Sequence, residues 1–288
     1  DLGDTVDNDG DGVADELVGH GTFVAGIIHL VAPEAELLSI RIVESDGRSN
    51  LFRLAQAIET AINAQVDVIN LSLGSNMHLD VVADAVLDAV NLGIPVICSV
   101  GNDGLATPVR FPAGYAESIA VAGTDDLDHA APFTNFGPHV TLSAPAIHVG
   151  STFPGGGFGF ADGTSYSAPL VTGVVARMLA ANPSLTPADI TLILQQTAVP
   201  IDAENPGMEG MLGAGRLNAH AALQAAGASA PLVQGDVTGD GRVDFSDLNT
   251  VLDAWAQSTA EGDADTNGVV NFIDLDIVLD SFGVGTTP

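Results

Sequence analysis

The segment Gly163-Thr164-Ser165-Tyr166-Ser167-Ala168-Pro169-Leu170-Val171-Thr172-Gly173 decides how the rest of the chain is interpreted. A turn of small residues delivers Ser165, and a strongly apolar helix then begins at once. The first N–H groups of a helix have no helical acceptor, so they can stabilise a negative charge. A serine hydroxyl fixed beside them suits nucleophilic attack that creates an oxyanion. Taken alone, the segment is equally compatible with an ordinary helix N-cap.

Composition limits the possible functions. The chain has 288 residues, which indicates one large domain or two smaller ones, and its hydrophobic content of 46% is ample for a sizeable core. The formal net charge is −30, and all seven basic residues are arginine. A nucleic-acid partner is excluded, because phosphate contacts require clustered cations. No apolar run is long enough for a transmembrane helix.

Apolar segments alternate between strand-like and helix-like patterns. Expected strands cover residues 37–43, 66–73, 95–100, 118–122 and 140–143, and expected helices cover residues 51–64 and 79–92, a segment that starts at 186–187, and a final one ending near 226. This alternation predicts a parallel sheet covered by helices on both faces. The single cysteine, Cys98, excludes an intrachain disulfide and is predicted to be a buried strand residue.

Ligands bind at the carboxyl ends of the strands in such sheets. The polar, glycine-rich segments Ser72-Leu73-Gly74, Ser99-Val100-Gly101-Asn102 and 133–137 are expected there. His20, between two glycines, opens another apolar helix. A lone histidine is usually structural, so only its partners give His20 a functional interpretation.

The C-terminal part of the chain repeats itself after a small, uncharged linker at residues 227–234. Two acidic loops lie 27 positions apart, and each has oxygen side chains at loop positions 1, 3, 5, 9 and 12 and glycine at position 6. This spacing predicts two Ca²⁺ sites, with carbonyl groups at position 7. The expected ligands are Asp236, Thr238, Asp240, Arg242, Asp244 and Asp247, and then Asp263, Asp265, Asn267, Val269, Asn271 and Asp274.

A third acidic stretch lies at residues 7–16. Its carboxylates Asp7, Asp9, Asp11 and Asp15 have the alternate spacing of a Ca²⁺ loop, but Val18 occupies the twelfth position. A calcium site and a solvated acidic loop both remain open for this stretch.

Together, the Gly-His20-Gly-Thr, Ser72-Leu-Gly, Gly-Asn102-Asp-Gly and Gly-Thr-Ser165-Tyr-Ser-Ala-Pro motifs resemble the subtilisin family of serine proteases (peptidase family S8). The resemblance covers residues 1–226. It implies a three-layer α/β fold in which Ser165 is the nucleophile and His20 the general base. Asn102 would donate its side-chain amide to the oxyanion, beside the Ser165 N–H.

The same resemblance assigns the walls of the substrate cleft. They would be formed by the backbone of Ser72, Leu73, Gly74, Ser99, Val100 and Gly101. An added-strand mode of peptide binding uses such walls. Because their residues are small, we expect an open, apolar primary pocket for large hydrophobic side chains.

The chain departs from the family at the third catalytic group. The family's aspartate ends a first strand well before the histidine, whereas only nineteen residues precede His20, and no apolar strand is among them. We therefore assign no triad aspartate and expect it, with its strand, upstream of Asp1. Full activity is not expected of residues 1–288 alone, because the aspartate orients the histidine and stabilises its charged form.

Residues 235–288 resemble a dockerin, a small α-helical module with two EF-hand-like Ca²⁺ loops that binds a cohesin. The loop positions that help to select a cohesin are Phe245-Ser246 and Phe272-Ile273, which are more apolar than the familiar pattern. The resemblance implies a cohesin-like or cell-surface partner for residues 235–285 and an association with polysaccharide.

We therefore predict a secreted or cell-surface serine endopeptidase that acts on proteins or peptides and carries a calcium-stabilised docking module. The alternative is a non-catalytic, calcium-dependent binding protein on a decayed protease scaffold. His20, Asn102 and Ser165 all remain within their motifs, which favours the enzyme.

Overall fold

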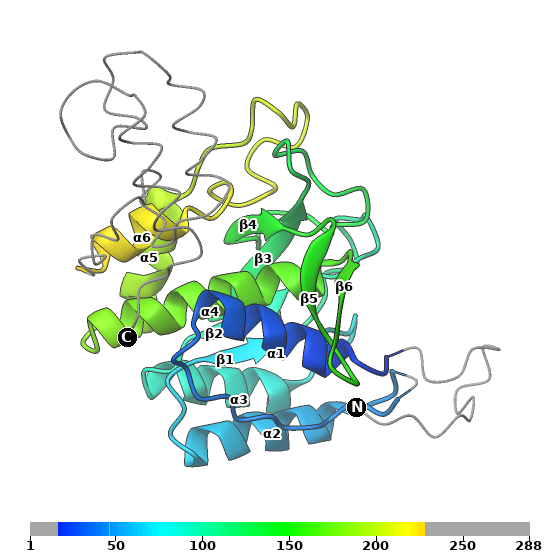
Figure 1. Ribbon diagram of the computed structural model, residues 1–288, viewed down its shortest axis with the longest axis vertical. Coiled ribbons are helices and arrows are strands. Elements are labelled where there is room, and N and C mark those ends of the chain that lie inside the picture. The colour runs from blue at the N-terminus through cyan, green and yellow to red at the C-terminus, as the bar shows by residue number, and fades with distance from the viewer. Residues whose placement is uncertain (1–16, 46, 228–288) are drawn as a thin grey trace. The chain divides into compact units, whose positions relative to one another are not determined.

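The computed structural model describes residues 17–45 and 47–227 (Figure 1). The chain divides into two units, Asp1–Ala226 and Gly227–Pro288. The helices of the described part are α1 (His20–Val31), α2 (Leu51–Asn63), α3 (Asp80–Asn91), α4 (Thr164–Ala181), α5 (Pro187–Thr197) and α6 (Ala219–Ala225). The strands are β1 (Ile69–Leu71), β2 (Val96–Ser99), β3 (Ile119–Thr124), β4 (Leu142–Pro145), β5 (Val149–Phe153) and β6 (Gly157–Ala161).

The central sheet is parallel, as the alternation of apolar segments predicts. Its strand order is β1-β2-β3-β4, and Ile69 pairs with Val96 where β1 meets β2. All residues of β2 and β3 are buried. Buried parallel strands are apolar along their whole length because both faces of the sheet are covered.

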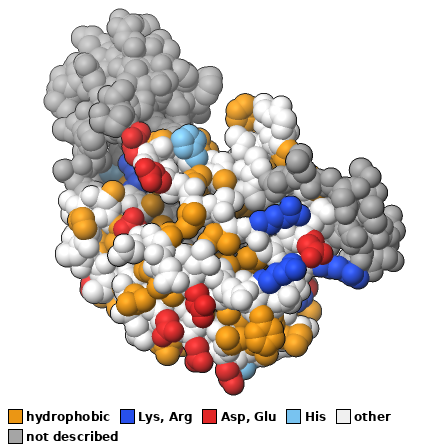
Figure 2. Space-filling view, turned by 90° about the horizontal axis from the view of Figure 1, so that it is seen from below, with side chains coloured by type: hydrophobic (Ala, Val, Ile, Leu, Met, Phe, Trp, Pro, Cys, Tyr) orange, Lys and Arg blue, Asp and Glu red, His pale blue; other side chains and the backbone are white. Residues whose placement is uncertain are grey.

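Helices cover both faces of the sheet (Figure 1). On one side, α2 and α3 pack together over the sheet, and their apolar residues form a core with Val96 and Cys98. On the other side, α4 crosses all four strands, and α1 and α6 pack against it. On the side seen in Figure 2, apolar and acidic side chains are interspersed over the described surface, and arginine side chains gather toward one edge of it.

The expected strand at residues 37–43 is the main error in the sequence-based fold. This segment has no strand, and Leu37 and Leu38 are 46% and 53% exposed. Ile40 and Ile42 nevertheless pack against the core. A strand requires a neighbour for its N–H and C=O groups, and in the described part of the chain β1 pairs only with β2. The apolar pattern is present, but no strand among the described residues pairs with it.

A second difference is the antiparallel hairpin β5–β6, which the sequence analysis did not anticipate. The Ser151 hydroxyl donates to the Phe23 carbonyl, and the Thr152 hydroxyl donates to the Thr22 carbonyl. The hairpin is therefore fixed against the beginning of α1.

No helix of the described ranges is long and apolar enough to cross a membrane.

Candidate active site

A cleft of about 250 Å³ lies where β1 and β2 end and α4 begins. It joins residues from four separate parts of the chain. The lining residues are Leu73, Gly74, Ser99, Gly101, Asn102, Asp103, Arg110, Thr164 and Ser165. The sequence-predicted Ser165 and Asn102 are thus brought to one cleft at the carboxyl edge of the sheet, where ligands bind in this class of fold.

Ser165 is held by the beginning of α4. The helix starts at Thr164, so Ser165 belongs to the first turn, after Gly163 with φ 151°. First-turn N–H groups have no acceptor within the helix, which leaves the Ser165 N–H available to a ligand. The Ser165 hydroxyl donates to the Ser72 carbonyl at 3.3 Å, while the Ser72 hydroxyl donates to the Ser165 carbonyl at 2.7 Å. Two bonds therefore tie the serine to the end of β1.

The orientation of Asn102 is set by Thr164. The Oδ1 atom of Asn102 accepts hydrogen bonds from the Thr164 N–H at 2.9 Å and from the Thr164 hydroxyl at 2.8 Å. The same hydroxyl accepts a bond from the Gly101 N–H at 3.2 Å. Since both donors hold the oxygen end of the amide, its Nδ2 group is left as the end that can donate into the cleft.

His20 opens α1, which packs along α4. Its ring lies 6.0 Å from that of Tyr166, the neighbour of Ser165, and Tyr166 in turn contacts Phe23 at 4.5 Å (centroid distances). Burial lowers the pKa of His20 below its ordinary value, because desolvation disfavours the charged imidazolium. Within the described ranges its imidazole has no hydrogen bond to Ser165 and no carboxylate partner.

Four of the residues predicted to form the cleft walls line the cleft: Leu73, Gly74, Ser99 and Gly101. Val100 is fully buried, and the Ser72 hydroxyl bonds to the Ser165 carbonyl. The same lining also contains the ion pair of Asp103 and Arg110, which the expectation of an apolar pocket did not include. Arg110 belongs to no motif that the sequence analysis identified. The only signal for it in the sequence is that it is one of seven basic residues in the chain.

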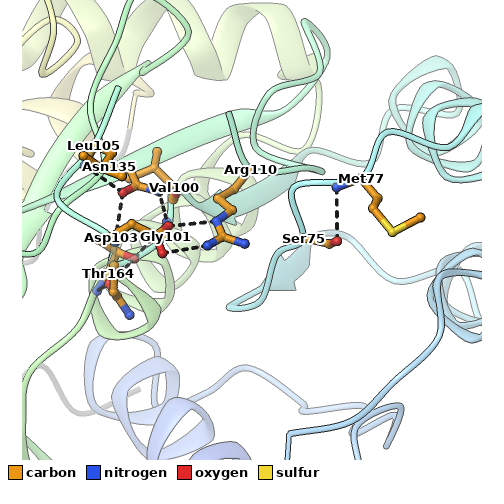
Figure 3. Close-up of polar contacts among 10 residues, drawn as sticks. Ser75, Met77, Val100, Gly101, Asp103, Leu105, Arg110, Asn135 and Thr164 are labelled. Atoms are coloured by element: carbon orange, nitrogen blue, oxygen red, sulfur yellow. Dashed lines mark hydrogen bonds and ion pairs between the residues drawn. The ribbon is translucent and has the colours of Figure 1, made fainter. Parts of the chain in front are cut away.

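The segment at residues 133–137 does not line the cleft but holds a loop that does. The Asn135 side chain is buried and bonds to the loop after β2 through the N–H groups of Asp103 and Leu105 and the Val100 carbonyl (Figure 3). Its role is therefore to fix the loop that carries Asn102.

The expected Ca²⁺ ligands lie outside the described residues, both at positions 7–15 and at positions 236–274. In residues 17–45 and 47–227, no group of three or more His, Cys, Asp or Glu side chains could hold a metal ion. Cys98 is fully buried in β2, as predicted, and burial raises the pKa of its thiol to about 12.

Comparison with known proteins agrees with this geometry. Residues 3–220 match the model of the subtilase family. The chain is 36% identical over 215 residues to Subtilisin BL of Lederbergia lenta, covering 72% of this chain and 78% of that protein. It is 34% identical over 217 residues to Subtilisin NAT of Bacillus subtilis subsp. natto, covering 71% and 56%.

Solved structures show the same fold. Proteases from Pseudoalteromonas arctica superimpose with a TM-score of 0.66 at 27% identity, covering 72% of this chain and 70% of theirs. A cold adapted subtilisin-like serine proteinase superimposes with a TM-score of 0.63 at 27% identity, covering 70% and 76%.

Proposed function

The chain belongs to the subtilase family of serine endopeptidases, and from this premise we propose that Ser165, His20 and Asn102 carry out peptide hydrolysis in it. The observation that carries the proposal is the shared cleft: Ser165 and Asn102 line it together, and Thr164 leaves the amide nitrogen of Asn102 free to donate. A protein or peptide is the substrate.

The proposed reaction begins when the Ser165 Oγ attacks the scissile carbonyl and His20 takes the hydroxyl proton. The carbonyl oxygen becomes an oxyanion, which accepts hydrogen bonds from Asn102 Nδ2 and from the Ser165 N–H. The intermediate then collapses, and His20 gives its proton to the departing amine. Water attacks the acyl-enzyme by the same route and releases the carboxylic acid and the free Ser165.

The Ser165 hydroxyl must turn away from the Ser72 carbonyl, to which it donates in the structure, before it can donate to His20. Catalytic hydrogen bonds are often long or absent in a free enzyme and form in the substrate complex. Within residues 17–45 and 47–227 the imidazole has no carboxylate partner, and this observation favours the second candidate, a non-catalytic binding protein built on the same scaffold.

A fluorophosphonate reagent separates these two candidates. We expect it to modify Ser165 in the protein expressed from its whole gene, and we expect the modification to be lost in the His20→Ala variant. Ser184→Ala, at an exposed serine after α4, serves as the matched control and should leave labelling unchanged. Labelling that fails, or that persists without His20, favours the non-catalytic protein.

We also propose that residues 235–288 form a separate dockerin-like module that binds two Ca²⁺ ions and attaches a secreted enzyme to a partner. The support is the repeat itself, two acidic loops in the same register 27 positions apart. In the intact chain with Ca²⁺, we expect this module to unfold in a transition of its own at low temperature. A chelator should abolish that transition, because the module does not fold without its metal ions. Asp236→Ala with Asp263→Ala should have the same effect without chelator. A transition that is insensitive to both treatments contradicts the module.

A further inference from the structure

The Arg110 side chain crosses the cleft between two glycines. A Cβ atom at Gly101 would lie 2.8 Å from Arg110 Cγ, and a Cβ atom at Gly74 would lie 3.4 Å from Arg110 Cβ. Two hydrogen bonds between Ser75 and Phe111 fix the segments that carry Gly74 and Arg110. The absence of side chains on both walls therefore makes room for the arginine stem within the cleft.

The arginine head is held by a two-point ion pair (Figure 3). Arg110 Nε donates to Asp103 Oδ2 at 2.8 Å, and Nη2 donates to Oδ1 at 2.6 Å. The buried Asn135 amide also donates to Asp103 Oδ2 at 3.0 Å. Since Asn135 is itself bonded to the loop after β2, the position of the guanidinium is preset rather than adaptable.

Most of the acceptor capacity of this pair is used, whereas Arg110 keeps free donors. Both Asp103 oxygens already accept bonds, whereas the Nη1 group of Arg110 has no partner within the described ranges. Arg110 is the only cation among the residues that line the cleft. A ligand that reaches this pair thus meets the unpartnered Arg110 N–H groups beside a carboxylate whose charge Arg110 already balances.

We infer that Arg110 is a specificity-determining residue that favours substrates whose side chain next to the scissile carbonyl ends in an acceptor oxygen, as in glutamine or glutamate. The inference rests on the proposed peptidase function. Ser165 and Asn102 fix the place of that carbonyl, and the side chain of the residue that supplies it enters the same cleft. Lysine and arginine side chains are disfavoured, because Arg110 repels them and the charge of Asp103 is already paired with Arg110.

The test measures binding and turnover separately. Peptides of one alanine-rich sequence carry glutamine, glutamate, leucine or lysine before the scissile bond. Dissociation constants are measured on the Ser165→Ala variant, which cannot turn over, and kcat/KM is measured on the wild-type protein. We expect the glutamine and glutamate peptides to bind at least about tenfold more tightly than the lysine peptide.

The Arg110→Met variant removes the donors but keeps a stem that fills the space between the glycines. Because Asp103 then has no cation beside it, we expect the lysine peptide to be preferred. The ratio of the dissociation constants of the lysine and glutamine peptides should change by at least about tenfold. The milder Arg110→Lys variant keeps the charge but not the planar fork and should give an intermediate preference. Thermal unfolding checks that each variant is folded. Arg53→Met, which removes an exposed ion pair with Glu44 outside the cleft, should leave the preference unchanged.

An unchanged order of the four peptides in folded Arg110→Met and Arg110→Lys overturns the inference. A wild-type preference for lysine or leucine overturns it as well. If binding follows the expected order while no peptide is cleaved, the specificity inference stands and the proposed hydrolysis fails.

Discussion

The Ser72 hydroxyl donates a 2.7 Å hydrogen bond to the carbonyl oxygen of Ser165, and this bond replaces one that the helix cannot make. The residue four positions after Ser165 is Pro169, which lies inside α4 and has no N–H group. The end of β1 thus completes the first turn of α4. The same contact fixes the Ser165 backbone relative to the sheet.

Replacement of Ser72 by alanine should leave the Ser165 carbonyl without its donor. We expect a loss of about 1–2 kcal/mol in the free energy of unfolding, measured by denaturant titration. In a Pro169→Ala background the restored helical N–H can serve the same carbonyl, so the Ser72→Ala substitution should cost less there. Equal costs in the two backgrounds would contradict this account of the bond.

Asn102→Leu should reduce kcat while KM changes little, because the lost donor acts on the charge that develops in the transition state. Removal of one such donor costs about 10²–10³-fold in the rate of enzymes of this family. The measurement is steady-state kinetics on a peptide substrate, with titration of the fluorophosphonate-reactive serine to confirm that the site is intact. A change confined to KM would place Asn102 in substrate binding instead.

Thr164→Val should act through Asn102, because valine has the shape of threonine but cannot donate to Asn102 Oδ1. The backbone N–H of residue 164 still holds that oxygen, so we expect a smaller loss of kcat than in Asn102→Leu. Thr164→Ser keeps the hydroxyl and serves as the control. In the Asn102→Leu background, Thr164→Val should have no further effect on kcat; additive losses would refute the positioning role.

The pH dependence of kcat/KM should report the buried state of His20. Only the neutral imidazole can accept the serine proton, and burial lowers its pKa below the ordinary 6.5. Activity should therefore persist as the pH falls through 6.5 and be lost only at lower pH. The contribution of His20 to the free energy of unfolding depends on pH in the same direction. It is fully present above pH 6.5 and is lost as the pH falls toward the lowered pKa of the folded state. A half-maximal point at or above pH 6.5 would contradict a His20 whose pKa is set by burial alone.

Cys98 should resist thiol reagents in the folded protein. It is fully buried in β2, and its thiol, with a pKa of about 12, forms almost no thiolate near neutral pH. Labelling should proceed only after denaturant unfolds the domain. Rapid reaction of one thiol per chain in native buffer would contradict the position of β2 in the core.

The sequence by itself determined the helices and strands whose residue patterns lie within one continuous segment of the chain. The periodicity of α2 and α3, the Thr186-Pro187 start of α5 and the apolar run around Cys98 all depend on neighbouring residues along the chain. The motif around Asn102 directly follows the parallel strand β2, so it lies at the sheet edge where loops after parallel strands meet, and Ser165 at the start of α4 lines the same cleft.

Contacts between distant residues were decided only by the tertiary structure. Residues 37–43 have the pattern of a strand but form none, because strand formation depends on a partner elsewhere. The Ser72–Ser165 bonds and the passage of Arg110 between Gly74 and Gly101 likewise join segments far apart in the chain. Residue patterns encode which surfaces are apolar and which turns are tight, but the charge inside a cleft is set by which side chains the packing brings together.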